Sequence, residues 1–201
     1  ILTRTSNRPI GFEKCINSVN NQTYRNVRNI ISYDDPEDLG YIKKHNVDCI
    51  RVLREVRGDG NFSDENKFEP YNLYCNELLK EVQEGWIMFL DDDDMLADEK
   101  TLENIVANLQ NGNDTLIIWK TKFPNGALLP PEWEFKHKQI RFERIDTACF
   151  IFHSKYKDVS RWDSWYAADF RFIEGLTKHI PKKKWMPQVF TLKNNFGDRG
   201  R

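Results

Sequence analysis

The sequence lacks the residues and patterns that define several large classes of protein. Of its 201 residues only four are cysteine and four are histidine, and no two cysteines form a CxxC pair. Such spacing fits neither a structural zinc site nor a dense disulfide framework, so we expect free thiols and a cytoplasmic protein. No apolar run approaches the roughly 20 residues of a membrane-spanning helix, and the first residues lack the apolar stretch of a signal peptide.

Neither sign of charge dominates the composition. The chain has 30 Lys+Arg against 31 Asp+Glu and a formal net charge of −1, which excludes a protein held to nucleic acid mainly by attraction to phosphate. A content of 39% hydrophobic and 13% aromatic residues is enough for a core and excludes wholesale disorder. With this length, no internal repeat and no long linker, the sequence predicts one domain, residues 1–201.

Short β-rich runs alternate with helical patterns in the first part of the chain. The expected strands are residues 1–5, 27–33, 49–53, 86–90 and 115–119, and the expected helices are 10–19, 37–45, 71–82 and 102–109. This order predicts an α/β fold with a mostly parallel central sheet and helices on both faces.

The alternation weakens after about residue 120. The remaining expected elements are a loop at 57–66 in the first half, a loop-like stretch at 123–144, a strand at 148–153, a helix at 169–176, and a basic tail from Pro181 that ends in the Gly-rich residues 194–201.

Four consecutive aspartates, Asp91 to Asp94, directly follow the apolar run 86–90. Adjacent carboxylates repel one another and are costly to desolvate unless a cation lies among them. In an open α/β sheet, ligands bind beyond the carboxyl ends of the strands. Mn²⁺ or Mg²⁺ takes one or two carboxylates there and fills its other positions with phosphate oxygens and water. The pattern predicts such a metal site; a solvated acidic turn is the alternative.

Two further polar segments end strands at the same predicted edge. A carboxylate at Asp34 or Asp35 can accept hydrogen bonds from a nucleobase or a ribose, or Asp35 can cap the next helix. Residues 3–6 (Thr-Arg-Thr-Ser) offer hydroxyls, backbone N–H groups and a cation to a diphosphate. An ordinary βα turn is the alternative for that segment.

Taken together, these stretches resemble the family 2 glycosyltransferases with the GT-A fold. The resemblance rests on residues 3–9, 31–35 and 86–94 in that order, and the last stretch is similar to the family's DxD signature after its hydrophobic strand. It implies a single GT-A (Rossmann-like) domain in which residues 1–120 bind the nucleotide sugar and residues 121–201 bind the acceptor.

The resemblance also implies roles for individual positions. Those that would contact the donor nucleotide, its sugar or its phosphates are Thr3, Arg4, Thr5, Arg8, Asp34, Asp35, Asn76, Asp91 and Asp92. Asp93 and Asp91 would bind the metal, and Asp92 and Asp94 stay candidates because the run of acids leaves the register open by one residue. Asn72 lies on the same predicted helix face as Asn76, and a plain exposed helix position is the alternative for both.

The catalytic base is expected in the second half. Inverting enzymes of this family commonly place an Asp or Glu at the start of a late helix, and residues 165–172 are similar, with Asp169 as the expected base. It would remove the proton of the acceptor hydroxyl, while the metal stabilises the departing diphosphate. Ala168 stands where the family often has Glu, and helix capping is the alternative role for Asp169. Asp163 and Glu174 are the fallback bases.

Several other side chains are candidates for the same site. Trp165, with Trp133, Trp162 and Tyr166, can stack on a sugar ring or belong to the core. His153 is a candidate third metal ligand, with a hydrogen-bonded core position as the alternative. Arg199 and Arg201 can reach a diphosphate only from an ordered tail.

The sequence thus predicts a metal-dependent glycosyltransferase. It would move a sugar from a nucleotide-diphosphate donor, with a UDP-sugar favoured, to a hydroxyl of a glycan, lipid-linked or protein-linked acceptor, with inversion. A nucleotidyltransferase is one alternative, although residues 7–11 match its Gly-rich basic loop poorly. A nucleotide- or glycan-binding module without catalysis is the other.

Overall fold

Two sheets form the scaffold of the protein. The computed structural model describes residues 1–53, 69–109 and 112–193. In the first sheet, β1 (Leu2–Arg4), β2 (Ile30–Tyr33) and β3 (Asp48–Arg51) are parallel and lie in the order β1-β2-β3. The second has the order β4-β8-β6-β9-β5, with β7 paired to β6. Its strands are β4 (Trp86–Met88), β5 (Asp94–Leu96), β6 (Thr115–Lys122), β7 (Leu128–Leu129), β8 (Phe150–His153) and β9 (Lys182–Lys193).

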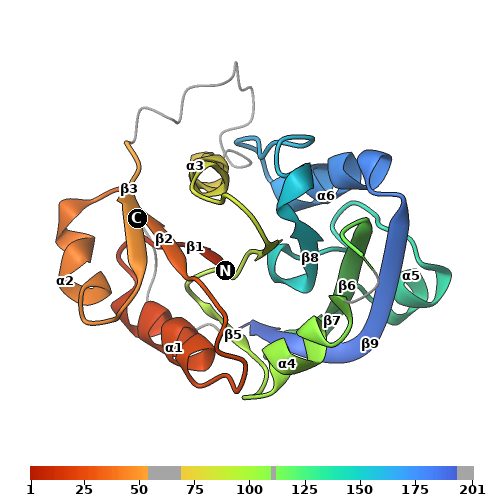
Figure 1. Ribbon diagram of the computed structural model, residues 1–201, viewed down its shortest axis with the longest axis horizontal. Helices are drawn as coiled ribbons and strands as arrows, with labels where there is room; N and C mark the ends of the chain where they lie inside the picture. Colours follow the sequence, from red (N-terminus) through yellow and green to blue (C-terminus); the bar gives the residue numbers. More distant parts are fainter. Residues whose placement is uncertain (54–68, 110–111, 194–201) are drawn as a thin grey trace.

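The two sheets meet edge to edge at β1 and β4. Leu2 and Phe89 form an isolated parallel bridge, and the N–H of Leu90 donates to the carbonyl of Leu2 at 3.0 Å. The carboxyl ends of β1 and β4 therefore lie side by side, so residues that follow Arg4 and residues that follow Phe89 share one edge. Figure 1 shows the parallel sheet on one side of this seam and the second sheet on the other.

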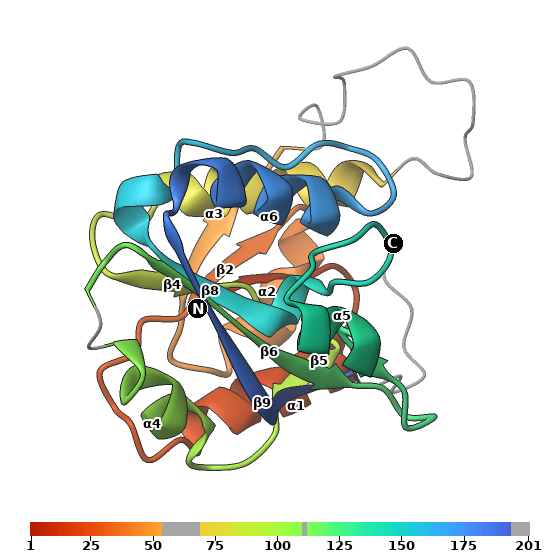
Figure 2. The same ribbon diagram turned by 90° about the vertical axis from the view of Figure 1, so that its right-hand side faces the viewer.

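Helices pack on the sheets through the apolar stripes that the sequence contains. The helices are α1 (Pro9–Asn20), α2 (Leu39–Ile42), α3 (Tyr74–Lys80), α4 (Thr101–Val106), α5 (Glu132–His137) and α6 (Ala168–His179), and the 3-10 turns are η1 (Pro36–Asp38), η4 (Pro70–Leu73), η6 (Thr147–Cys149) and η7 (Ser154–Tyr156). In α3 the residues of the predicted stripe, including Cys75 and Leu78, are buried. Figure 2 shows α3 and α6 on one side of the strands and α1 and α4 on the other.

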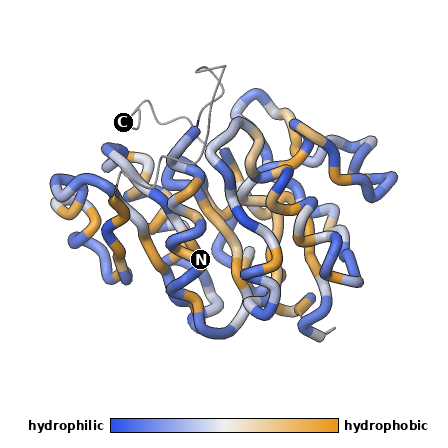
Figure 3. The backbone as a smooth tube through the Cα atoms, turned by 90° about the horizontal axis from the view of Figure 1, so that it is seen from above, coloured by the Kyte–Doolittle hydropathy of each residue, from blue (hydrophilic) through white to orange (hydrophobic). Residues whose placement is uncertain are grey.

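The core lies mainly around the second sheet and continues across the seam. A large cluster of buried residues joins Leu2 and Ile30 of the first sheet to Ile117 and Phe152 of the second. A smaller cluster holds α1 and α2 against β2. Hydrophobic stretches run through the middle of the molecule and alternate with hydrophilic ones toward its edges (Figure 3). No helix in the described parts of the chain is long and apolar enough to cross a bilayer.

The prediction of a mostly parallel central sheet holds for the first sheet and is wrong for the second. Within the described residues, β6 and β9 are parallel, whereas the pairs β4–β8, β5–β9, β6–β7 and β6–β8 are antiparallel. The physical reason is the loss of strand–helix–strand repeats after β6, because parallel neighbours need such long crossover connections.

The largest correction concerns the expected basic tail. Residues Lys182–Lys193 form the twelve-residue strand β9, which pairs with β6. Lys182 and Lys183 start the strand exposed to solvent, whereas Met186 and Phe190 are buried, so the lysine run conceals a strand pattern. The register shifts near Pro187, where a residue without an N–H cannot continue the ladder. The stretch 123–144 also contains β7 and α5, while the expected loop at 57–66 and tail at 194–201 lie outside the described residues.

Candidate functional site

The four aspartates leave β4 as a tight turn at the seam. The N–H of Asp94 donates to the carbonyl of Asp91 at 2.9 Å, and Asp94 itself begins β5. The turn is fixed on one side by β4 and on the other by β5, so the carboxylates are held by strands rather than by a free loop. The edge is the one that the sequence predicted for ligand binding.

Arg4, at the end of β1, reaches across the seam to the first of these acids. Its Nε lies 2.9 Å from Asp91 Oδ1, its Nη2 lies 3.3 Å from Asp91 Oδ2, and its Nη1 donates to Asn72 Oδ1. Burial alone would raise the pKa of Asp91, but Arg4 and then Lys193 outweigh it, so the pKa lies below its usual value. Asp91 is therefore ionised at neutral pH, as a ligand for a cation or a hydroxyl must be.

Arg8 pairs with the next two acids from the start of α1. It precedes Pro9, the first residue of α1, and its Nη1 lies 3.1 Å from Asp92 Oδ1 and 2.8 Å from Asp93 Oδ2. Asp92 is almost fully buried, and burial raises its pKa to about 7 against the opposing effect of Arg8. Burial also raises the pKa of Asp93, and repulsion from Asp91 adds to this.

Lys193, the last residue of β9, is a member of this site that sequence reasoning missed. Its Nζ lies 2.8 Å from Asp94 Oδ2, 3.3 Å from Asp146 Oδ2 and 3.8 Å from Asp91 Oδ2. Burial opposes its charge, but Asp146, Asp94 and Asp91 raise the pKa of the ammonium well above its usual value. The strand pattern of β9 is the sequence feature that could have placed Lys193 in this site. For Asp146, the cap of η6, we can identify no such feature.

These groups surround two cavities that share Arg4. The first, of about 320 Å³, which we call the donor cavity, is lined by Arg4, Thr5, Ser6, Arg8, Tyr71, Tyr74, Asp91, Asp92, Asp93 and Lys193. The second, of about 190 Å³, which we call the Asp169 cavity, is lined by Arg4, Glu69, Asn72, Leu129, Glu143, Ile145, Thr147, Trp162, Tyr166, Ala167, Ala168 and Asp169. Of the predicted donor positions, Arg4, Thr5, Arg8, Asp91 and Asp92 line the first cavity, and the predicted base, Asp169, lines the second, to which Arg4 also belongs.

Asp34 and Asp35 take different places beside the donor cavity. Asp34 is buried and accepts hydrogen bonds from Ser6 Oγ at 3.2 Å and Tyr74 OH at 3.0 Å, and both donors line the cavity. Asp35 is the N-cap of η1 and accepts from the N–H of Glu37 at 3.0 Å, which is the capping alternative stated for it.

The two predicted threonines of β1 and its turn are both buried. Thr5 Oγ1 lies 2.9 Å from the Tyr41 hydroxyl and Thr5 lines the donor cavity. Thr3 is not among the lining residues of either cavity, and its Oγ1 has no hydrogen-bond partner among the described residues.

Asp169 lies in the first turn of α6 and lines the second cavity. Its Oδ1 accepts a hydrogen bond from the N–H of Phe170 at 2.7 Å. Burial, and then repulsion from Asp146, raises its pKa to about 7. A carboxylate with such a pKa can accept and release a proton near neutral pH, as a general base must.

Three predicted candidates, Asn76, Asp163 and Trp165, make structural contacts and are not among the residues that line either cavity. The amide of Asn76 donates to the carbonyl of Trp162 at 2.8 Å and accepts from its N–H at 2.9 Å. Asp163 forms an ion pair with Arg171 at 2.5 Å. The carbonyl of Trp165 accepts from Asn72 Nδ2 at 3.1 Å. Asn72, which also contacts Arg4, is the residue of this helix face that lines a cavity.

His153 lies at the wrong end of the sheet for a metal ligand. It is paired with Trp86 at the start of β4, whereas the aspartates follow the end of that strand. Its ring packs edge-on against Trp86 at 5.5 Å between centroids, and its Nδ1 accepts a hydrogen bond from the N–H of Lys155 at 3.3 Å, but the residue is half-buried rather than in the core. Arg199 and Arg201 lie outside the described residues.

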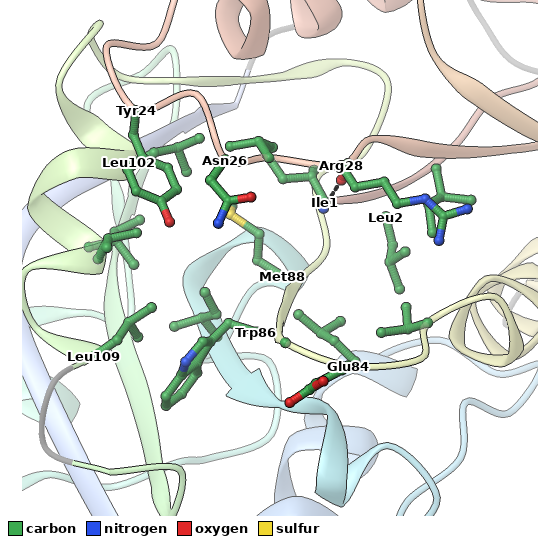
Figure 4. A pocket seen from close by; sticks show the side chains of 18 of the residues that line it. Ile1, Leu2, Tyr24, Asn26, Arg28, Glu84, Trp86, Met88, Leu102 and Leu109 are labelled. Carbon is green, nitrogen blue, oxygen red and sulfur yellow. Dashed lines mark hydrogen bonds between the residues drawn. The ribbon is translucent and has the colours of Figure 1, made fainter.

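A third cavity, of about 460 Å³, lies at the amino ends of the strands (Figure 4). Apolar side chains such as Leu2, Met88, Leu102 and Leu109 dominate its lining, and Tyr24, Asn26, Arg28 and Glu84 add polar groups. Because ligands of open α/β sheets bind beyond the carboxyl ends of strands, this cavity is not the candidate site.

The carboxylate oxygens around the donor cavity suit a divalent cation that is also coordinated by phosphate oxygens and water. Around the donor cavity the carboxylates of Asp91 to Asp94 and Asp146 outnumber the cations Arg4, Arg8 and Lys193, and Asp92 Oδ2 and Asp94 Oδ1 are buried with no hydrogen-bond partner among the described residues. No group of three His, Cys, Asp or Glu side chains in the same parts of the chain is arranged to hold a metal. The residues therefore fit an ion that takes one or two carboxylates and completes its shell with phosphate oxygens and water.

Comparisons with known proteins identify the fold. No protein-family model and no curated protein matches the sequence. Among solved structures, TarS 1–349 from S. aureus superposes with a TM-score of 0.71 at 16% identity, covering 96% of this chain and 59% of that one. The same fragment in complex with UDP-GlcNAc has a TM-score of 0.64 at 11% identity.

A mannosyltransferase from Pyrobaculum calidifontis, in complex with GDP-Man and Mn²⁺, also has a TM-score of 0.64 at 11% identity, covering 98% of this chain and 57% of that one. This chain therefore spans less than two thirds of the length of the structures it matches. At such identities the likeness establishes the architecture, and the chain shares the GT-A type fold of these glycosyltransferases.

Proposed function

We propose that the protein is a metal-assisted glycosyltransferase that moves a sugar from a nucleotide-diphosphate donor, with a UDP-sugar favoured, to a hydroxyl acceptor with inversion. The observation that carries the proposal is the pair of cavities on either side of Arg4. One contains an acidic cluster with three cations, and the other contains a carboxyl group whose pKa is about 7. The fold is shared with structures that contain UDP, UDP-GlcNAc or GDP-Man with Mn²⁺.

Different side chains at the donor cavity contact different parts of the donor. Asp34, with Ser6 and Tyr74, provides hydrogen-bonding groups for the nucleoside, and Arg8 and Lys193 attract the diphosphate. Asp91 and Asp93 would hold the cation, which supplies positive charge to the departing diphosphate when it is bound. Arg4 lies between Asp91 and Asn72 and so orients the acid next to the sugar.

In the Asp169 cavity, the base acts on the acceptor. Asp169 accepts the proton of the acceptor hydroxyl as its oxygen attacks the anomeric carbon, on the face opposite the bond to the diphosphate. The backbone N–H of Phe170 holds one oxygen of this carboxylate at 2.7 Å and leaves the other for the acceptor. A single displacement by a hydroxyl on the opposite face inverts the anomeric centre.

The test is a thermal-shift series with nucleotide sugars. UDP, UDP-sugars and GDP-sugars are each added with and without Mn²⁺, and we expect one donor to raise Tm only when Mn²⁺ is present, because Asp91 and Asp93 would hold an ion that neutralises the diphosphate. Asp93→Ala should remove the metal-dependent part of the shift, whereas Asp158→Ala, an exposed acid on a turn elsewhere, should keep it. If no nucleotide diphosphate changes Tm, the proposal fails.

A further inference from the structure

The Asp169 cavity has a marked excess of negative charge. Its lining includes the carboxyl groups of Glu69, Glu143 and Asp169 and a single cation, Arg4, among the described residues. The charge of Arg4 is already compensated, because its Nε lies 2.9 Å from Asp91 Oδ1 and its Nη1 donates to Asn72. A ligand that enters this cavity therefore meets carboxylates without a free counter-charge.

Three other basic side chains from the second half of the chain have acidic partners. Arg171 donates to the carbonyl of Tyr166 at 3.0 Å and forms an ion pair with Asp163 at 2.5 Å. Arg141 lies 3.6 Å from Glu134. Lys193, whose charge lowers the pKa of Asp169, lies 2.8 Å from Asp94 Oδ2 and 3.3 Å from Asp146 Oδ2. Arg171 and Lys193 therefore offset part of the negative charge of the lining, but each already pairs with a carboxylate outside it.

Two features of the same cavity suit a carbohydrate. Tyr166, which lines it, is 43% exposed and packs edge-on against Phe142 at 6.3 Å between ring centroids, so an aromatic surface is open to the C–H face of a sugar. Trp162 also lines the cavity and is 2% exposed, and its Nε1–H donor has no acceptor among the described residues. A buried donor of this kind usually has an acceptor in the functional state, and a sugar oxygen is a suitable one.

We propose that the Asp169 cavity selects an uncharged sugar as the acceptor and rejects acceptors with a phosphate or carboxylate next to the reacting hydroxyl. The inference rests on the proposed function. Glu69 and Glu143 accept hydrogen bonds from sugar hydroxyls, and the ring stacks on Tyr166. The acceptor oxygen forms a bond to the anomeric carbon, the bond from that carbon to the diphosphate oxygen breaks with its electron pair on the phosphate, and the hydroxyl proton goes to Asp169.

The physical basis of the selection is electrostatic. A second negative charge in a site already lined by carboxylates is repelled and must also be desolvated, whereas a hydroxyl both donates to a carboxylate and accepts from an N–H. The site would thus gain specificity in two ways, by repelling anionic acceptors and by forming hydrogen bonds with neutral ones.

The experiment compares matched acceptors with one nucleotide-sugar donor. Methyl glycosides of glucose, galactose, mannose and N-acetylglucosamine are assayed beside the corresponding 6-phosphates and, for the first three, uronic acids, and donor hydrolysis without acceptor is measured in parallel. We expect kcat/KM for a neutral glycoside to exceed that of its charged partner by at least about tenfold. Glu143→Gln should shrink this ratio, whereas Glu103→Gln on α4, away from the cavity, should leave it unchanged.

A second pair of variants separates stacking from folding. Tyr166→Ala should raise KM for the neutral acceptor with donor hydrolysis retained, and Tyr166→Phe should raise it less, because the ring remains and only the hydroxyl that contacts Glu143 is lost. Use of charged acceptors as well as neutral ones, or no transfer to neutral glycosides while donor hydrolysis continues, overturns this inference and leaves the donor reaction standing. If no donor is bound or hydrolysed, the proposed function fails and this inference fails with it.

Discussion

Identical residues at adjacent positions acquire different chemistry in this site. Asp91 and Asp92 are neighbours, yet the pKa of Asp91 lies below its usual value and that of Asp92 is raised to about 7. Both are buried; the difference arises because Arg4 and Lys193 together outweigh burial at Asp91, whereas Arg8 does not do so at Asp92. The run of four aspartates is therefore one acid whose pKa lies below its usual value, followed by three acids whose pKa values are raised, chiefly by burial.

The same reasoning gives a testable property of Asp169. Burial raises its pKa from 3.8 to about 7, so the folded protein favours the protonated form and loses stability as pH rises from about 4 to about 7. Asp169→Asn keeps the acceptor for the Phe170 N–H and removes the cost of the charge. We expect a higher Tm than wild type at pH 8, with the difference shrinking at pH 5, measured by thermal unfolding at both values.

Transfer activity should increase with pH over the range in which the stability of the folded protein decreases. Wild-type transfer should rise with pH up to about 7 and then level off, because only ionised Asp169 accepts a proton. Asp169→Asn should lower kcat at least about 100-fold with donor-induced thermal shifts preserved. Normal transfer by this variant would show that another group is the base.

At the scale of elements, α3 couples the site to the second half of the chain. Asn76 on α3 makes two hydrogen bonds with the backbone of Trp162, and Asn72 joins Arg4 to the carbonyl of Trp165. Because Trp162 also lines the Asp169 cavity, the position of that cavity depends on α3.

Removal of this coupling has a predictable cost. Asn76→Ala leaves the buried N–H and carbonyl of Trp162 without partners and should lower the free energy of unfolding by about 2–3 kcal/mol. Lys80→Ala, an exposed change on the same helix, should cost less than about 0.5 kcal/mol. Urea unfolding followed by circular dichroism measures both, and equal effects of the two variants would contradict the role assigned to Asn76.

The sequence predicts helices and strands correctly where the apolar periodicity is strong. It does not predict strand β9, whose apolar residues are preceded by a run of lysines. The apolar stripe locates the helix α3, although its first residue, Tyr71, is exposed in the turn η4, and the run 86–90 locates the strand before the aspartates. Strand β9 was missed because lysines occupy its exposed start, and with it Lys193 was missed. Local patterns also identify which acids follow a strand, but not that Asp146 lies 3.3 Å from Lys193, because that proximity depends on how β9 packs.

At the scale of the molecule, the site lies on the seam between two sheets. Arg4 and Arg8 come from the parallel side, and Asp146, Asp169 and Lys193 come from the second half of the chain. The aspartates after β4 lie between these groups. A diphosphate in the donor cavity would therefore contact both sides at once, and its binding should stabilise the seam rather than one sheet.

This arrangement predicts a single unfolding transition for both sheets. The shared core cluster and the Leu2–Phe89 bridge join them, so their stabilities should not separate. All six tryptophans lie from residue 86 onward, so tryptophan fluorescence reports on the second sheet, whereas amide exchange in β2 reports on the first. We expect the same urea midpoint from both probes, and an equal rise of both midpoints with donor and Mn²⁺. A β2 midpoint well below the fluorescence midpoint would mean that the parallel sheet unfolds independently and that the seam does not transmit stability.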